Sequence, residues 1–153
     1  MGNLSTSTHS YTIQETSKLT GLPESTLRYY ESVGIIEPVD RAASSKHRMY
    51  SEANLNVLDA IACLNATGLS LNDIKTYMQN REKGALAAND QVMLLKRQEL
   101  RLKKEEESIK IREEYVNLKI AYWRAIEAGS EVESQKIAGD ARQLTLRLKE
   151  IRK

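Results

Sequence analysis

The second half of the chain carries an apolar residue at every seventh position. These residues are Leu95, Leu102, Ile109, Val116 and Trp123. A repeat of seven is typical of a coiled-coil seam, and it predicts one long helix over about 88–127. The other seam position is polar, with Gln98, Glu105, Arg112 and Lys119. Because one long helix with a single apolar stripe is not stable alone in water, we expect a partner, most simply a second copy in a homodimer.

Shorter helical patterns fill the first half. Thr12 stands three residues before Glu15, which is a capping box and predicts the start of a helix. Ile13, Thr16 and Leu19 fall on one face of this helix. Gly21 then predicts a turn, and Pro23 opens a second helix that stops at Gly34. Two short helices joined by a glycine-containing turn are typical of a helix-turn-helix unit.

A small hairpin is expected next. Residues 35–39 are β-prone, residues 40–46 are polar, and residues 47–50 form a second β-prone run, so the pattern predicts a two-stranded wing. Ser51 and Ser70 stand at the N-cap positions of two further helices. The inward positions of these two helices are Leu55, Leu58, Ile61, Ala62, Leu64, Ile74 and Met78.

After Gly129, a last helix begins behind Ser130. Its apolar face carries Ile137, Ala141, Leu144, Leu148 and Ile151. The predicted fold class is therefore mainly α, with a winged helix-turn-helix head, a long dimerisation coiled-coil helix and a short C-terminal helix. The expected divisions are a disordered tail at 1–10, the head at 11–80, a linker and long helix at 81–127, and the C-terminal helix at 128–153.

Composition narrows the function. One cysteine among 153 residues excludes an internal disulfide framework and a cysteine-rich metal cage, and we expect no metal and no cofactor. No apolar stretch is long enough to span a bilayer, and residues 1–10 have no secretory apolar core, so a cytoplasmic location is expected. The chain offers no nucleophile–base pair, glycine-rich phosphate loop or paired carboxylates, which argues against an enzyme.

Charge indicates DNA binding only through its local placement. Residues 1–80 hold six basic and eight acidic side chains, a net charge of −2. A recognition helix needs a cation for phosphate and polar side chains that reach the backbone or base edges. The candidate DNA contacts are Ser25, Thr26, Arg28 and Tyr29 on the second helix and Arg41, Lys46, His47 and Arg48 in the wing. Leu27 and Tyr30 are expected to face the core. The competing interpretation is a solvated charged surface, with the tyrosines in core packing.

Several motifs in order resemble the DNA-binding head of the mercury-resistance-regulator (MerR) family. They are Thr26–Glu31 with Gly34, then Arg48–Tyr50, then Gly68–Leu71 with Ile74. The resemblance implies a homodimer on double-stranded promoter DNA with an overlong spacer, which the effector-bound state bends and untwists so that RNA polymerase can engage it. One departure concerns Lys46, because family members often carry glycine at this position before the second wing strand. The resemblance therefore leaves the shape of the hairpin turn open.

The effector is open on the sequence alone. Residues 61–70, which include Cys63, and residues 118–123 resemble the aldehyde- and thiol-stress-responsive branch of the family, which makes Cys63 a candidate sensor. The competing interpretation is that Cys63 is a small buried hydrophobe. Tyr115, Tyr122 and Trp123 form a third candidate, a pocket for a small apolar ligand. A coiled-coil adaptor that does not bind DNA is the alternative function for the whole chain.

Overall fold

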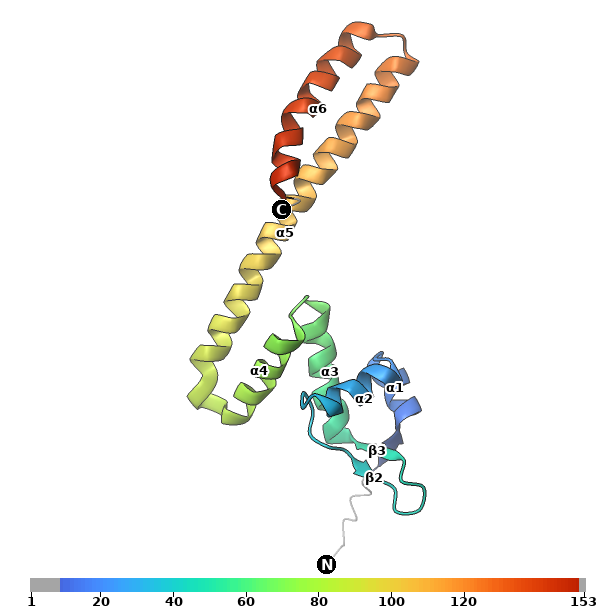
Figure 1. The fold of residues 1–153 in the computed structure, drawn as a ribbon, viewed down its shortest axis with the longest axis vertical. Helices are drawn as coiled ribbons and strands as arrows, with labels where there is room; N and C mark the ends of the chain where they lie inside the picture. Colours follow the sequence, from blue (N-terminus) through green and yellow to red (C-terminus); the bar gives the residue numbers. More distant parts are fainter. Residues whose placement is uncertain (1–8, 152–153) are drawn as a thin grey trace, which may run out of the picture. The chain divides into compact units, whose positions relative to one another are not determined.

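The computed structural model describes residues 9–151 and is mainly helical (Figure 1). Its contacts divide the chain into two compact units, one ending at Leu95 and one beginning at Lys96. Most of the predicted N-terminal tail, residues 1–8, lies outside the described residues, and the first strand already begins at Ser10. The predicted fold class is confirmed.

The first unit opens with the expected pair of short helices. Strand β1 (Ser10–Thr12) leads into α1 (Ile13–Thr20), where Thr12 Oγ1 accepts a hydrogen bond of 3.2 Å from the backbone N–H of Glu15. Gly21 ends α1 with a left-handed backbone (φ 74°), a conformation that glycine adopts without a steric cost. Helix α2 (Glu24–Ser32) follows at once. The tight turn therefore fixes α2 against α1, as the helix-turn-helix prediction requires.

The wing belongs to a three-stranded antiparallel sheet. Strands β2 (Asp40–Arg41) and β3 (Arg48–Ser51) form the expected hairpin, with Arg41 opposite Arg48. Strand β1 pairs with the other edge of β3, which gives the order β1-β3-β2. The prediction of a two-stranded wing missed this third strand. Strand β1 has only three residues, which is too short to show the alternation of apolar and polar positions that indicates a strand.

The prediction of a strand over residues 35–39 is wrong. This segment is irregular, and β2 begins only at Asp40. The backbone N–H groups of Ile35 and Ile36 both donate to the carbonyl of Tyr30, at 2.9 and 3.3 Å, and that of Val39 donates to the carboxylate of Glu31 at 2.8 Å. Because α2 takes these donors and Pro38 has none, the segment cannot form a ladder.

Helices α3 (Glu52–Ala66) and α4 (Leu71–Lys83) complete the head, and both predicted serine caps are confirmed. The short 3₁₀ helix η1 (Gly84–Ala87) joins α4 to the next helix. The core of the head consists of Leu22, Leu27, Tyr30, Ile35, Ile36, Val39, Tyr50, Leu58, Ile61, Leu69, Ile74 and Leu94. On the predicted common face of α1, Thr16 is fully buried but Leu19 is 61% exposed.

Helix α5 (Ala88–Glu127) has the expected bounds, and α6 (Glu131–Ile151) runs back antiparallel to its C-terminal half (Figure 1). Within the second unit, α6 covers an α5 stripe that includes Ala125, and it buries its own predicted face at Ala141 and Leu144. The seam predicted from the heptads lies on a different stripe of α5. All five seam residues are exposed, from 41% at Leu95 to 65% at Trp123. No helix among the described residues is long and apolar enough to cross a membrane.

Candidate nucleic-acid interface

Helix α2 presents a polar face outward and an apolar face inward. Leu27 and Tyr30 are buried, as predicted. Ser25, Arg28 and Tyr29 are exposed, and Thr26 is half-buried. The guanidinium of Arg28 lies 3.3 Å from the carboxylate of Glu24 one turn earlier, an exposed pair that a phosphate can displace at small cost. The exposed face of α2 thus offers a cation with hydroxyl and phenol groups beside it.

The wing turn depends on an unusual backbone at Lys46. This residue has φ 61°, and it is the non-glycine residue with positive φ in the described part of the chain. The N–H of Lys46 donates to the carbonyl of Ala42, and the N–H of Ala42 donates to the carbonyl of His47, both at 2.9 Å. The turn therefore has the left-handed conformation that favours glycine, with a lysine in its place. Lys46 also places an exposed ammonium group in the wing turn, which a glycine would not provide.

The wing and α2 meet around one groove of about 410 Å³. Four predicted contacts line it, namely Arg28, Arg41, His47 and Arg48. Ser25, Thr26, Tyr29 and Lys46 lie outside this lining. Sequence reasoning missed four further lining residues, which are Thr12, Ile13 and Gln14 at the start of α1 and Glu24 at the start of α2. The groove thus combines three guanidinium groups with the N-terminus of a helix, and both features favour a phosphate backbone.

Glu31 is a further residue of the interface that sequence reasoning did not single out as a contact. Its Oε1 accepts a hydrogen bond of 3.1 Å from Nε of Arg48 and lies 3.6 Å from Nη2 of Arg41. Its Oε2 accepts the 2.8 Å bond from the backbone N–H of Val39. Its side chain is only 12% exposed. One carboxylate on α2 therefore holds both wing arginines and the segment that leads into the wing.

Tyr50 lies beneath this network. It is fully buried on β3, and within the described residues its hydroxyl has no hydrogen-bond partner. Burial is the main cause that raises the pKa of Tyr50 above its ordinary value of 10.0; the charge of Arg48 lowers the pKa by a smaller amount, and that of Glu31 raises it. The hydroxyl therefore stays neutral at physiological pH and is a buried polar group without compensation.

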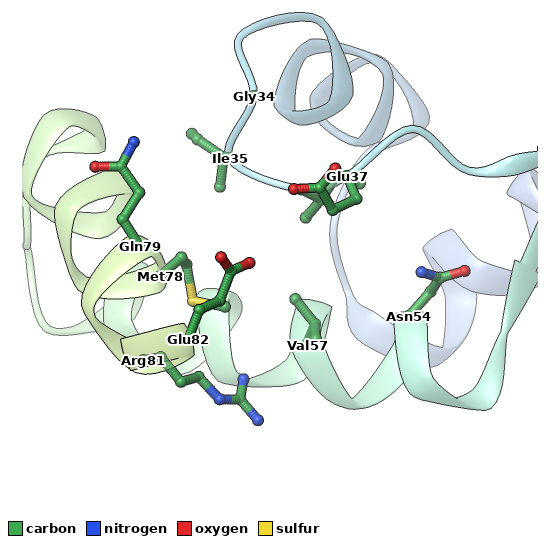
Figure 2. Close-up of a pocket in the computed structure, with 10 residues that line it drawn as sticks. Gly34, Ile35, Glu37, Asn54, Val57, Met78, Gln79, Arg81 and Glu82 are labelled. Atoms are coloured by element: carbon green, nitrogen blue, oxygen red, sulfur yellow. The ribbon is translucent and has the colours of Figure 1, made fainter. Parts of the chain in front are cut away.

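A second hollow of the head, about 530 Å³, faces a different set of elements (Figure 2). Ile35 and Glu37 come from the segment after α2, Val57 from α3, and Met78 and Glu82 from α4. Figure 2 shows these side chains around one open space, with apolar groups beside two carboxylates. The lining of this pocket shares no residue with that of the cationic groove, so the pocket does not extend the groove.

None of the candidate effector residues lines the groove of the interface. Cys63 is exposed on α3, so the interpretation as a buried core residue is wrong. In the second unit, Tyr115 and Trp123 share a shallow depression of about 450 Å³. The rings of Tyr122 and Trp123 meet edge to face at 5.3 Å, but Tyr122 does not line that depression. The three aromatics therefore form no single enclosed pocket. Across residues 9–151 there is no cluster of three or more side chains able to hold a metal ion.

One known protein family matches the sequence of the head. The family model described as "MerR HTH family regulatory protein" matches residues 11–81, the helices, wing and groove described above. Residues 11–81 are a MerR-family regulator domain. The resemblance seen in the sequence motifs is thereby confirmed, and the MerR match covers both elements that carry the candidate DNA contacts.

Individual proteins similar to this chain are also transcriptional regulators. The chain is 35% identical over 90 residues to the HTH-type transcriptional regulator AdhR of Bacillus subtilis, covering 58% of this chain and 64% of the relative. It is 33% identical over 70 residues to the uncharacterized regulator YyaN of the same organism, covering 46% of this chain and 50% of the relative. The chain thus spans one half to two thirds of these two relatives.

A solved structure extends the likeness beyond the head. The crystal structure of HiNmlR, a MerR family regulator lacking the sensor domain, bound to promoter DNA, has 25% sequence identity and a TM-score of 0.66. The likeness covers 84% of this chain and 96% of that one. All three proteins are regulators, in agreement with the prediction that this chain is not an enzyme.

Proposed function

We propose that this MerR-family chain is a sequence-specific DNA-binding transcription regulator. The observation that carries the proposal is the groove in which Arg28 of α2 meets Arg41 and Arg48 of the wing. A recognition helix beside a cationic wing gives two phosphate-reaching elements on one head, and such elements can repay the several kcal/mol that bending DNA costs. HiNmlR was solved on promoter DNA, which supports the same role here.

The regulator acts as a homodimer through the uncovered seam of α5. Leu102, Ile109 and Val116 are 42–55% exposed in the single chain, while α6 occupies a different stripe of the helix. Two heads on one dimer fit a dyad-symmetric promoter. In the full proposal, the dimer bends and untwists a promoter with an overlong spacer, so that RNA polymerase engages both of its elements. A cytoplasmic location follows from access to that DNA.

The test measures affinity for a DNA fragment from upstream of the gene, by fluorescence anisotropy at several salt concentrations. Arg28→Glu is expected to abolish specific binding and to leave dimerisation intact. Lys18→Glu is the matched control, since Lys18 is an exposed cation on α1 outside the groove. If wild type and Arg28→Glu bind equally, or if wild type shows no salt dependence, the chain is better described as a coiled-coil adaptor.

The proposed effector is a small electrophile that reacts with Cys63. Exposure of this cysteine on α3 supports the proposal, because access is one of the two conditions for a reactive thiol. With an aldehyde, the sulfur adds to the carbonyl carbon and the thiol proton goes to the carbonyl oxygen, which gives a hemithioacetal. Run-off transcription with and without a small aldehyde tests this. Wild type should respond and Cys63→Ser should not; equal responses would exclude the thiol.

The pocket of Figure 2 supports a second effector class, a small apolar ligand. Its volume of about 530 Å³ and its apolar side chains Ile35, Val57 and Met78 fit such a molecule. An uncharged naphthylamine dye should then bind the wild type and bind Val57→Trp more weakly, because the indole fills the space. Equal dye binding by both proteins would remove this candidate.

A further inference from the structure

Glu31 joins the two DNA-facing elements of the head. It lies in the last turn of α2, while Arg41 and Arg48 face each other on β2 and β3. Its Oε1 lies 3.1 Å from Arg48 and 3.6 Å from Arg41, and its side chain is 12% exposed. Two of the three guanidinium groups that line the groove are therefore paired with one shielded carboxylate before DNA arrives.

This pairing affects different DNA sequences differently. Binding to random DNA rests on the number of cations free to neutralise phosphates. Glu31 reduces that number, because a phosphate must compete with it for Arg41 and Arg48. The same carboxylate fixes the wing relative to α2, since it also accepts the N–H of Val39 at 2.8 Å. A fixed geometry favours a DNA site whose backbone matches the groove. Glu31 therefore lowers the affinity for the correct site less than it lowers the affinity for random DNA.

We propose that Glu31 is a specificity-determining positioning residue, which holds Arg41 and Arg48 in the free protein and thereby weakens binding to random DNA more than binding to the promoter. The inference rests on the proposed DNA-binding function.

The experiment compares affinity for promoter DNA and for random-sequence DNA of equal length, across a range of salt. Glu31→Gln keeps an acceptor for the N–H of Val39 but loses the charge. We expect its affinity for random DNA to rise about three- to tenfold, with a salt slope steeper by about 1 to 2 per head. Affinity for the promoter should change less, so the ratio of the two affinities falls.

Asp40→Asn is the matched control. Asp40 is exposed on β2 next to Arg41 and, in the described part of the chain, makes no ion pair. Its loss removes the same charge without releasing an arginine, so both affinities should rise by a similar small factor. If Asp40→Asn lowers the affinity ratio as much as Glu31→Gln does, the effect is general charge and the inference is overturned.

Glu31→Asp is the second variant and guards against a folding defect. It keeps the charge, but the side chain is one methylene shorter and cannot hold both arginines and Val39. We expect it also to raise affinity for random DNA, by a smaller factor than Glu31→Gln. Wild-type values for Glu31→Asp would overturn the positioning role. If the wild type itself does not prefer the promoter, it is the proposed function that fails.

Discussion

The ammonium group of Lys75 on α4 donates a hydrogen bond of 2.9 Å to the backbone carbonyl of Val33, the C-cap residue of α2. The last carbonyls of a helix lack partners within the helix and carry partial negative charge, so a lysine is well suited to them. Because the two residues are 42 positions apart, the bond ties the far side of the head to the helix that carries Arg28.

We therefore expect Lys75→Met to lower the stability of the head by about 1.5 to 3 kcal/mol, the range for a hydrogen bond to a charged group. Methionine keeps most of the aliphatic stem, so the loss reports on the ammonium. Urea denaturation followed by circular dichroism gives the value. Lys18→Met is the control, and if it costs as much as Lys75→Met, the bond to Val33 does not contribute.

The left-handed backbone of Lys46 gives a second prediction. Holding a non-glycine residue at φ 61° costs about 1 kcal/mol, so Lys46→Gly should raise stability by about 0.5 to 1 kcal/mol. Lys46→Ala removes the same ammonium without relieving the strain. If thermal denaturation shows the two variants to be equally stable, the turn carries no strain at this position.

Tyr50→Phe removes a buried hydroxyl that has no partner in residues 9–151. Stability at neutral pH should stay the same or rise by up to about 1 kcal/mol, because the desolvation cost of the hydroxyl disappears. Tyr29→Phe, on the exposed face of α2, is the control and should have no effect. A clear loss of stability in Tyr50→Phe would mean that the hydroxyl has a partner, such as a bound water.

The same residue predicts a response to alkali. Burial raises the folded-state pKa of Tyr50 above the ordinary value of 10.0, so the native state binds more protons than the unfolded state above that pH. Titration of Tyr50 should leave the free energy of unfolding unchanged below about pH 10 and should lower it as pH rises toward the folded-state pKa. Tyr50→Phe should show a shallower fall, whereas parallel curves for the two proteins would contradict the assignment.

Local signals explain why so much of the fold was predictable. The caps at Thr12, Ser51 and Ser70 lie within three residues of the groups they bind. Helix α5 was predictable because it contains the heptad repeat that runs from Leu95 to Trp123. Such features depend on neighbours in the sequence, and a single chain displays them completely.

The parts that escaped prediction depend on distant residues. Glu31 reaches Arg48 across 17 positions, and the irregular path of residues 35–39 follows from hydrogen bonds to α2. The exposure of Cys63 depends on which face of α3 the rest of the head covers. None of these relations has a periodic signature, so sequence reasoning placed the cations of the interface but not the carboxylate that holds them.

The uncovered seam of α5 supplies the last prediction. Ile109 and Val116 are 55% and 54% exposed in the single chain, one heptad apart, on a stripe that α6 leaves free. Ile109→Asp places a charge where a second seam would have to bury it, which is costly without a partner charge. Light scattering should therefore show the variant as a monomer, with the helical content of the head unchanged.

Asn117→Asp is the control, because it adds the same charge next to Val116 but off the seam, and this variant should remain dimeric. Loss of dimer by both variants would indicate a general charge effect, and loss by neither would place the dimer contact on another face of the chain.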